Sequence, residues 1–336
     1  MAGPAPSHDV RLPVAAPVTW APALRALAAH SVPGLAETDL AAGRHTQTVR
    51  TPAGSARVTV TLVDGAPDVP CSVTLPDGAD LEDVLARVGR WLDLEHDPEP
   101  VDAHLAADPL LAPLVAARPG LRVVGSTDGW ETAVTTVLGQ QVSVAAARTF
   151  ARRLVAAVGA AAGPSATDPG PASDSPAGPP PTDPGPASDS PAVTPPTDSA
   201  PAADSPAVTP RFPSAEAVAA VDPTVLGPAV GLTSARARTV HALATAVAGG
   251  LALGPGTDPA AVRARLLALP GIGPWTVEYL ALRALGDRDA CPSSDLVLRR
   301  ALGGLTPRAV EAASQRWRPW RAYAVTHLWT QAAYAG

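Results

Sequence analysis

The chain of 336 residues contains no lysine, so all 25 of its basic residues are arginine. Its side chains cannot supply a lysine amine as a nucleophile, which excludes mechanisms that pass through a lysine Schiff base. Cysteine is scarce as well, and the two that occur, Cys71 and Cys291, lie far apart and outside any CxxC pattern. This scarcity excludes a disulfide framework, a zinc knuckle and an iron–sulfur cluster, and we expect two buried, reduced thiols.

Long hydrophobic runs are also missing. The longest apolar stretches, such as 154–163, consist largely of alanine and glycine and are too short to span a bilayer. The first residues contain neither the basic segment nor the apolar segment of a secretory signal. From these absences we expect a cytoplasmic protein.

The net charge of −6 is unevenly distributed along the chain. Residues 1–110 carry 7 arginines against 15 acidic residues, whereas residues 211–336 carry 13 arginines against 8 acidic residues. A basic half in an acidic protein is compatible with a polyanionic partner, although a solvated arginine face is the commoner explanation.

Residues 163–210 differ from the rest of the chain in composition, since they are almost entirely proline, alanine, serine, aspartate, threonine and glycine. The motif TDPGPASDSPA begins at Thr167 and again at Thr182, which gives a 15-residue repeat. The repeat lacks the large apolar positions that a stacked solenoid needs. We therefore predict a disordered, mildly acidic insert that acts as a spacer.

Outside the insert, two parts of the chain differ in their hydrophobic period. Within residues 14–112, apolar and polar residues alternate with period two in three segments, and apolar residues recur with a helical period in two others. This pattern predicts an α+β domain with a small antiparallel sheet and helices on one face. The predicted strands are 44–51, 55–63 and 69–75, and the predicted helices are 24–32 and 80–94. Residues 113–162 and 211–336 read as helical, so we predict one all-α domain that the insert interrupts.

The stretch ALPGIGPWTVEYLAL at 268–282 ends one helix and starts another almost at once. Asp258 and Pro259 suit the N-cap and first position of the first helix, and Pro274 suits the start of the second. Between them, Gly271 and Gly273 allow a sharp turn, and the second helix begins with unpaired N–H groups that suit a phosphate. A tight helix-to-helix connection without ligand is the alternative.

Several motifs occur in an order that resembles one family. These are VLGQQVSVAAA from Val137, the LPGIG stretch with its continuation to CPSSDLVLRRAL, and RWRPWRAYAVTHLW from Arg316. With them the chain resembles the helix-hairpin-helix (HhH-GPD) DNA glycosylase superfamily, most closely the DNA-3-methyladenine glycosylase II family. The resemblance implies that backbone around Leu269, Gly271 and Gly273, with Thr276, grips a DNA phosphate. It also implies a Na⁺ or K⁺ ion on hairpin carbonyls near Leu269 and Gly271, and no other cofactor or side-chain metal site.

The resemblance further assigns the residues that would act on a base. Asp295 takes the place of the catalytic carboxylate, although on local sequence alone it reads as an ordinary N-cap. Trp275, Tyr279 and Trp329 match the aromatic positions that hold a base flipped out of the duplex, where each alone would read as a core residue. Electron-rich rings favour alkylated purines, which carry a positive charge.

The segment GQQVS at 139–143 corresponds to the turn that contacts DNA and fills the gap left by the flipped base. We expect Gln140, Gln141 and Ser143 to contact DNA. Gln141 stands at the wedge position, where the family commonly has leucine, so the wedge here is polar.

The sequence thus predicts a monofunctional DNA glycosylase that excises alkylated bases of the 3-methyladenine type from duplex DNA. Because relatives that also cut the strand use a lysine close to position 275, we expect no AP-lyase activity. We expect a monomer associated with the bacterial nucleoid. The alternative is a non-catalytic helix-hairpin-helix DNA-binding protein in which Asp295 is only a helix cap.

Overall fold

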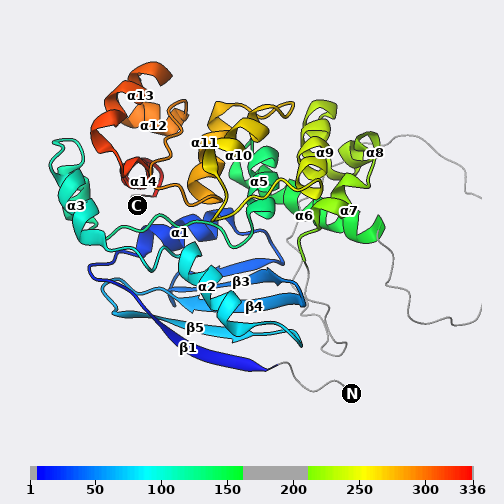
Figure 1. Ribbon diagram of the computed structural model, residues 1–336, viewed down its shortest axis with the longest axis horizontal. Helices are drawn as coiled ribbons and strands as arrows, with labels where there is room; N and C mark the ends of the chain where they lie inside the picture. The colour runs from blue at the N-terminus through cyan, green and yellow to red at the C-terminus, as the bar shows by residue number, and fades with distance from the viewer. Residues whose placement is uncertain (1–5, 162–210, 335–336) are drawn as a thin grey trace, which may run out of the picture. The chain divides into compact units, whose positions relative to one another are not determined.

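The computed structural model describes residues 6–161 and 211–334, and the predicted insert lies outside these ranges. A five-stranded sheet occupies the N-terminal part (Figure 1). All its strand pairs are antiparallel, in the order β1-β5-β4-β3-β2. The strands are β1 (Ser7–Pro13), β2 (Ala36–Asp39), β3 (Arg44–Thr51), β4 (Gly54–Thr61) and β5 (Asp68–Thr74).

The period-two pattern explains how the sheet buries one face. Every second residue of β5 is buried, and the same alternation runs through the middle of β4. These residues share a hydrophobic core with α2 (Leu81–Trp91), whose Val84, Val88 and Trp91 are spaced one turn apart. The predicted α+β class is therefore confirmed.

The remaining described helices form the helical part of the chain, with α1 packed between it and the sheet (Figure 1). The helices are α1 (Ala21–His30), α3 (Pro98–Ala106), α4 (Ala112–Ala117), α5 (Gly129–Leu138), α6 (Val144–Ala161), α7 (Ala215–Ala219), α8 (Pro223–Val230), α9 (Ser234–Ala248), α10 (Pro259–Leu267), α11 (Pro274–Arg283), α12 (Leu296–Ala301), α13 (Pro307–Ser314) and α14 (Arg321–Trp329). A 3₁₀ turn, η1 (Gln315–Trp317), and a π turn, η2 (Thr330–Tyr334), complete them. The expected all-α character of this part is confirmed.

Several elements were not predicted. Strands β1 and β2 and helices α3 and α8 are new, and the helical segment before the insert consists of two helices, α5 and α6, joined at 139–143 by the turn that the family resemblance implied. The apolar period passes through this turn without a break, so periodicity alone conceals it.

The buried residues form two hydrophobic cores. One lies between the sheet, α1 and α2, and includes Val58, Val60 and Trp91. The other fills the helical part and also takes in Leu105 of α3 and Leu111 next to α4. Cys71 lies in the first core and Cys291 in the second, both as free thiols whose pKa burial raises to about 11, as expected of buried structural cysteines.

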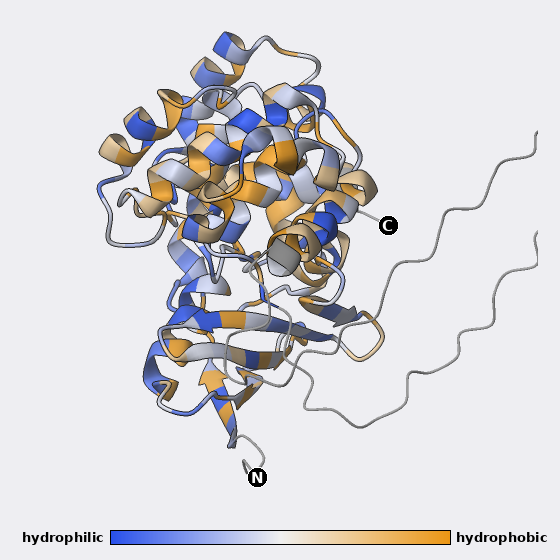
Figure 2. Cartoon of the chain, turned by 90° about the vertical axis from the view of Figure 1, so that its right-hand side faces the viewer, coloured by the Kyte–Doolittle hydropathy of each residue, from blue (hydrophilic) through white to orange (hydrophobic). Residues whose placement is uncertain are grey.

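Hydrophobic and hydrophilic residues are mixed along the helices (Figure 2). In keeping with this, none of the described helices combines the length and the apolar character needed to cross a membrane.

Candidate nucleic-acid interface and base pocket

The hairpin between α10 and α11 is built as its sequence suggests. The Asp258 carboxylate accepts a hydrogen bond from the N–H of Ala260 at 3.0 Å, which confirms it as the N-cap of α10. After α10 the backbone turns at Gly271, whose φ of 78° is a conformation that glycine adopts readily. Ile272 is buried and anchors the turn in the core, so the residues on either side of it are held at the surface.

Gly271 is also needed because of a close neighbour. A Cβ atom at this position would lie 2.1 Å from Thr239 Oγ1 of α9, far inside van der Waals contact. At Gly273, by contrast, φ is −102° and a Cβ would meet no atom within 4 Å. The first glycine is therefore required by packing and backbone conformation, whereas the second leaves the surface in front of the hairpin open.

The hairpin presents backbone donors outward. Neither the N–H of Gly271 nor that of Gly273 donates a hydrogen bond within the part of the chain that the structure describes. They stand beside the N-terminus of α11, where the first-turn N–H groups have no helical partner. Such a group of N–H donors at a helix start suits a phosphate.

Asp295 accepts three hydrogen bonds from N–H donors. It caps α12, with Oδ1 accepting from the N–H of Leu298 at 2.8 Å. The same Oδ1 accepts from the indole Nε1 of Trp329 at 2.9 Å, and Oδ2 accepts from the indole Nε1 of Trp275 at 2.8 Å. With 9% of its surface exposed, the carboxylate lies at the base of an aromatic cluster rather than in open solvent.

The aromatic residues of the expected base pocket lie together. The rings of Trp275 and Tyr279 are stacked, with centroids 5.2 Å apart and planes 20° apart. Tyr279 and Trp329 are 5.9 Å apart and tilted by 48°. Because Trp275 and Tyr279 already stack on each other, an incoming base would have to lie against an outer face of these rings.

Arg283 is a neighbour of this cluster that sequence reasoning missed. Its guanidinium carbon lies 5.8 Å from the centroid of the Tyr279 ring and 5.7 Å from that of Trp329. Its Nη1 donates to the backbone carbonyl of Val124, which ties α11 to the segment that leads out of the sheet. The sequence shows Arg283 only one turn after Tyr279 on the same helix, and that spacing could have indicated the contact.

The turn at 139–143 lies against the hairpin. Gln140 Nε2 donates to the carbonyl of Gly271 at 3.3 Å and to Thr276 Oγ1 at 3.0 Å. Gln141 is exposed and adopts a φ of 57°. Ser143 is exposed, and its Oγ accepts from the N–H of Ala146 in the first turn of α6.

The residues expected to contact DNA differ in how exposed they are. Gln141, Ser143, Gly271 and Gly273 have exposed or half-buried positions around the hairpin, and Leu269 is half-buried beside them. Thr276 is only 2% exposed and its hydroxyl already bonds to Gln140, so what it can offer to DNA is its backbone N–H.

The hairpin carbonyls have the chemistry of a monovalent cation site. The carbonyl of Leu269 accepts from Ile272 N at 3.3 Å, and that of Gly271 accepts from Gln140. Each oxygen has a second lone pair, and neutral carbonyls suit Na⁺ or K⁺. Among the described residues no group of three or more His, Cys, Asp or Glu side chains could hold a metal ion.

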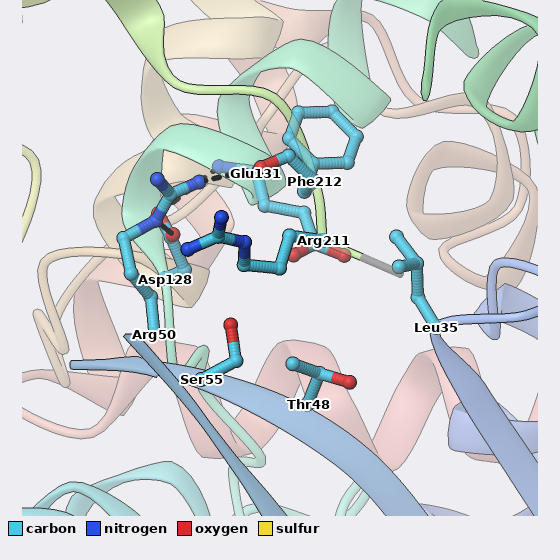
Figure 3. Close-up of a pocket in the computed structure, with 8 residues that line it drawn as sticks. All are labelled: Leu35, Thr48, Arg50, Ser55, Asp128, Glu131, Arg211 and Phe212. Carbon is cyan, nitrogen blue, oxygen red and sulfur yellow. Dashed lines mark hydrogen bonds and ion pairs between the residues drawn. The ribbon is translucent and has the colours of Figure 1, made fainter. Parts of the chain in front are cut away.

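A small cavity lies apart from this site, beside α5 (Figure 3). Its volume of about 20 Å³ has room for about one water molecule, so it is not a ligand site. Arg50 of β3 bonds both to Asp128 Oδ2 at 3.0 Å and to the carbonyl of Phe212 at 2.8 Å. Burial raises the pKa of Glu131 to about 8, the negative charge of Asp128 adds to the rise, and Arg50 opposes it.

Comparison with known proteins decides the family. The model of the HhH-GPD superfamily base excision DNA repair proteins matches residues 134–319, and that of the AlkA N-terminal domain matches residues 9–128. The chain belongs to the HhH-GPD superfamily. The hairpin, Asp295, Trp275 and Tyr279 fall inside the part that the superfamily model matches, whereas Trp329 lies ten residues beyond its end.

Named relatives of this HhH-GPD protein include two bacterial proteins that match most of the chain. It is 40% identical over 327 residues to the probable bifunctional transcriptional activator/DNA repair enzyme AlkA of Mycobacterium tuberculosis, a match that covers 96% of this chain and 56% of that protein. It is 28% identical over 245 residues to DNA-3-methyladenine glycosylase 2 of Escherichia coli, covering 73% and 70% of the two chains. The chain therefore spans little more than half the length of the mycobacterial relative.

Solved structures share the fold of this HhH-GPD protein. The 3-methyladenine DNA glycosylase from Archaeoglobus fulgidus superposes with a TM-score of 0.69 at 17% identity, covering 98% of this chain and 100% of that one. MBOgg1 in complex with a low-affinity DNA ligand superposes with a TM-score of 0.64 at 16% identity, covering 95% and 93%. At these identities the likeness shows the fold.

Proposed function

We propose that this protein is a monofunctional DNA glycosylase that flips alkylated bases of the 3-methyladenine type out of duplex DNA and hydrolyses their bond to the sugar. The observation that carries the proposal is the placement of the Asp295 carboxylate, which both pocket tryptophans bind through their indole N–H groups. The helix-cap bond to Leu298 accounts for only one of the three bonds that Asp295 accepts. A non-catalytic DNA-binding protein would not need the other two.

The carboxylate has the geometry that glycosidic bond cleavage needs. A carboxylate has about four acceptor positions, and the three N–H donors leave one open on Oδ2. As the base departs, the sugar C1′ becomes cationic, and a fixed negative charge beside it stabilises that transition state. The open position on Oδ2 would also orient the attacking water.

The substrate assignment rests on the aromatic cluster and the relatives. Stacking against Trp275, Tyr279 and Trp329 favours an electron-poor alkylated purine over a normal base. The Escherichia coli relative bears 3-methyladenine in its name. One lesion and one pocket require a single copy of the chain, so we expect a monomer that acts on chromosomal DNA in the bacterial nucleoid.

The absence of lysine sharpens the reaction type. Strand cleavage through a side-chain Schiff base requires a lysine amine, and the chain has none. The product would be an intact strand with an abasic site. Borohydride trapping should give no covalent protein–DNA complex, and strand breaks should appear only after heat or alkali.

The central test is the Asp295→Asn variant on methylated duplex DNA, with free base release measured under single-turnover conditions. Asparagine retains the helix cap, so the fold should persist while the charge is lost. We expect a fall in rate of about 10²-fold or more with DNA binding retained. Asp80→Asn is the matched control, because it neutralises another helix-capping aspartate, at the start of α2, which packs on the sheet and not in the hairpin, so it should keep its activity.

Two outcomes would overturn the proposal. Failure of the folded wild-type protein to release any base from several alkylated duplexes would favour the non-catalytic DNA-binding protein. Release by Asp295→Asn at the wild-type rate would move the catalytic role to another residue.

A further inference from the structure

The turn at 139–143 is held in a conformation that its own sequence does not favour. Gln141 has a φ of 57°, in the left-handed region that side chains other than glycine, asparagine and aspartate rarely adopt. Its side chain is exposed, so it makes no core contacts that would hold it there. A backbone of this kind persists where neighbouring groups fix it, and such places are often functional.

The neighbouring groups are Gln140 and Arg236. Arg236 of α9 donates from Nη2 to the backbone carbonyl of Gln140, the peptide that leads into Gln141. From the same residue, the Gln140 side chain reaches in the other direction to Gly271 and Thr276 of the hairpin. One residue is therefore bonded through its backbone to α9 and through its side chain to the hairpin.

Helix α9 braces the hairpin as well as the turn. Thr239 lies one turn after Arg236 and fills the space beside Gly271 so closely that no Cβ would fit there. Arg236 itself lies over the ring of Phe150 in α6, at 6.0 Å from the centroid. The turn, the hairpin and α9 thus form one connected unit through contacts between residues that are distant in sequence.

We propose that Arg236 and Gln140 are positioning residues that tie the Gln141 turn to the hairpin, so that gripping a phosphate and inserting Gln141 into the duplex occur as one movement. This inference rests on the proposed function. In this arrangement the side-chain amide of Gln140 bonds to the hairpin and not to DNA. Only the side chain of Gln141 inserts between the stacked bases. Arg236 acts through Gln140 and contacts neither the base nor the reacting carbon.

The consequence concerns base flipping rather than binding. The hairpin N–H groups remain in place without Arg236, because Ile272 and Gly271 hold the hairpin independently. The wedge turn would relax away from its left-handed conformation and lose its fixed distance from the phosphate grip. Misplacement of a positioning group by about 1 Å can lower a rate by about 10²-fold.

The experiment compares Arg236→Ala with Arg238→Ala. Arg238 is exposed on the same helix and makes no hydrogen bond or ion pair with the described residues, so its removal takes away the same charge without the contact. Both variants are measured for thermal stability, for Kd on undamaged duplex DNA, and for flipping by 2-aminopurine fluorescence in a duplex. The flipping assay uses the Asp295→Asn background, so its readout does not depend on excision.

We expect Arg236→Ala to bind undamaged duplex within about 3-fold of Arg238→Ala and to lose about 10-fold or more of the fluorescence-detected flipping equilibrium. Arg236→Lys, which retains a donor for the Gln140 carbonyl, should recover part of the loss. Gln140→Met, which keeps the length of the side chain but not its donors, should reproduce it. A flipping loss no larger than that of Arg238→Ala would overturn the inference.

A second substrate separates positioning from general damage to the fold. When the target base stands opposite an abasic site, less stacking and no pairing oppose its extrusion, so the wedge matters less. The defect of Arg236→Ala should then shrink to about 3-fold or less. An equal defect on both substrates would contradict a positioning role. Absence of base release by the wild type would overturn the proposed function, but the flipping measurement would still test the inference because it does not depend on excision.

Discussion

The two oxygens of Asp295 are not equivalent. Oδ1 accepts from Leu298 and Trp329 and has no position left, while Oδ2 accepts only from Trp275. Both tryptophans therefore have a second task besides stacking, since their N–H groups fix the plane of the carboxylate. Trp275 and Trp329 would thus position the base by stacking and also orient the Asp295 carboxylate that acts on the sugar of that base.

Replacement of Trp329 by phenylalanine tests this second task. The ring that can stack is largely retained, but Asp295 Oδ1 loses a charge-assisted hydrogen bond of about 1.5–3 kcal/mol. We expect the single-turnover rate of base release to fall about 10- to 100-fold with Kd for DNA little changed. Kd and single-turnover rate on methylated duplex DNA measure the two effects separately.

Trp317→Phe supplies the control. Trp317 is buried and its Nε1 donates to the Asp108 carboxylate at 2.6 Å, which is the same kind of bond outside the pocket. Its loss should lower the melting temperature without slowing base release in the folded protein. Equal slowing by both variants would mean that the effect of Trp329→Phe reflects stability rather than the orientation of Asp295.

At the level of elements, the two glycines of the hairpin have different structural roles, and alanine substitutions distinguish them. Gly271→Ala would force a methyl group against Thr239 and place alanine at a φ of 78°. We expect a loss of about 1–3 kcal/mol in the free energy of unfolding. Adding Thr239→Ala removes the clash but not the backbone strain, so the double variant should recover only part of the loss in thermal denaturation.

Gly273→Ala should behave in the opposite way. The methyl group meets nothing in the protein, so the melting temperature should stay close to that of the wild type. It would, however, stand in front of the open N–H groups where a phosphate is expected, and the Kd for duplex DNA should rise. Unchanged DNA affinity in this variant would remove Gly273 from the proposed phosphate site.

The hairpin was predictable because its signals are local. Asp258, Pro259 and Pro274 mark helix starts by chemistry that operates within one turn, and the structure places the helix boundaries where they indicate. The turn at 139–143 was expected only from the family resemblance, because no local pattern marks it and Gln140 is fixed by Gly271 and Arg236, more than 90 residues away. Arg236 was missed for the same reason, since its partner is a backbone carbonyl that no sequence pattern marks.

For the whole molecule, sheet and helices were predictable from the period of hydrophobicity, but the contacts that join them were not. Arg283 reaches Val124, and Arg50 of the sheet reaches Asp128, the N-cap of α5, and the carbonyl of Phe212. These bonds use charged side chains that a sequence would place at the surface. They form where two hydrophobic cores meet, and that meeting depends on the complete fold.

Glu131 makes this junction sensitive to pH. The folded protein holds its pKa near 8 against an unperturbed value of 4.5, because burial and Asp128 disfavour the charged carboxylate. Below about pH 4.5 the group is neutral in both states and carries no penalty. As pH rises towards 8 the unfolded chain ionises first, so unfolding releases a proton and the free energy of unfolding falls.

Glu131→Gln removes this dependence. The variant should gain stability over the wild type progressively between about pH 4.5 and 8, reaching about 2 kcal/mol, which is below the full equivalent of the pKa shift because the side chain keeps some solvent contact. Melting temperatures measured across this range give the difference. Glu216→Gln is the control, because Glu216 is exposed on α7 and its pKa is lowered rather than raised, so this variant should gain nothing at high pH. A constant difference between Glu131→Gln and the wild type from pH 5 to 9 would show that Glu131 ionises normally in the folded protein. The junction would then owe its stability to Arg50 and Asp128 without a titrating neighbour.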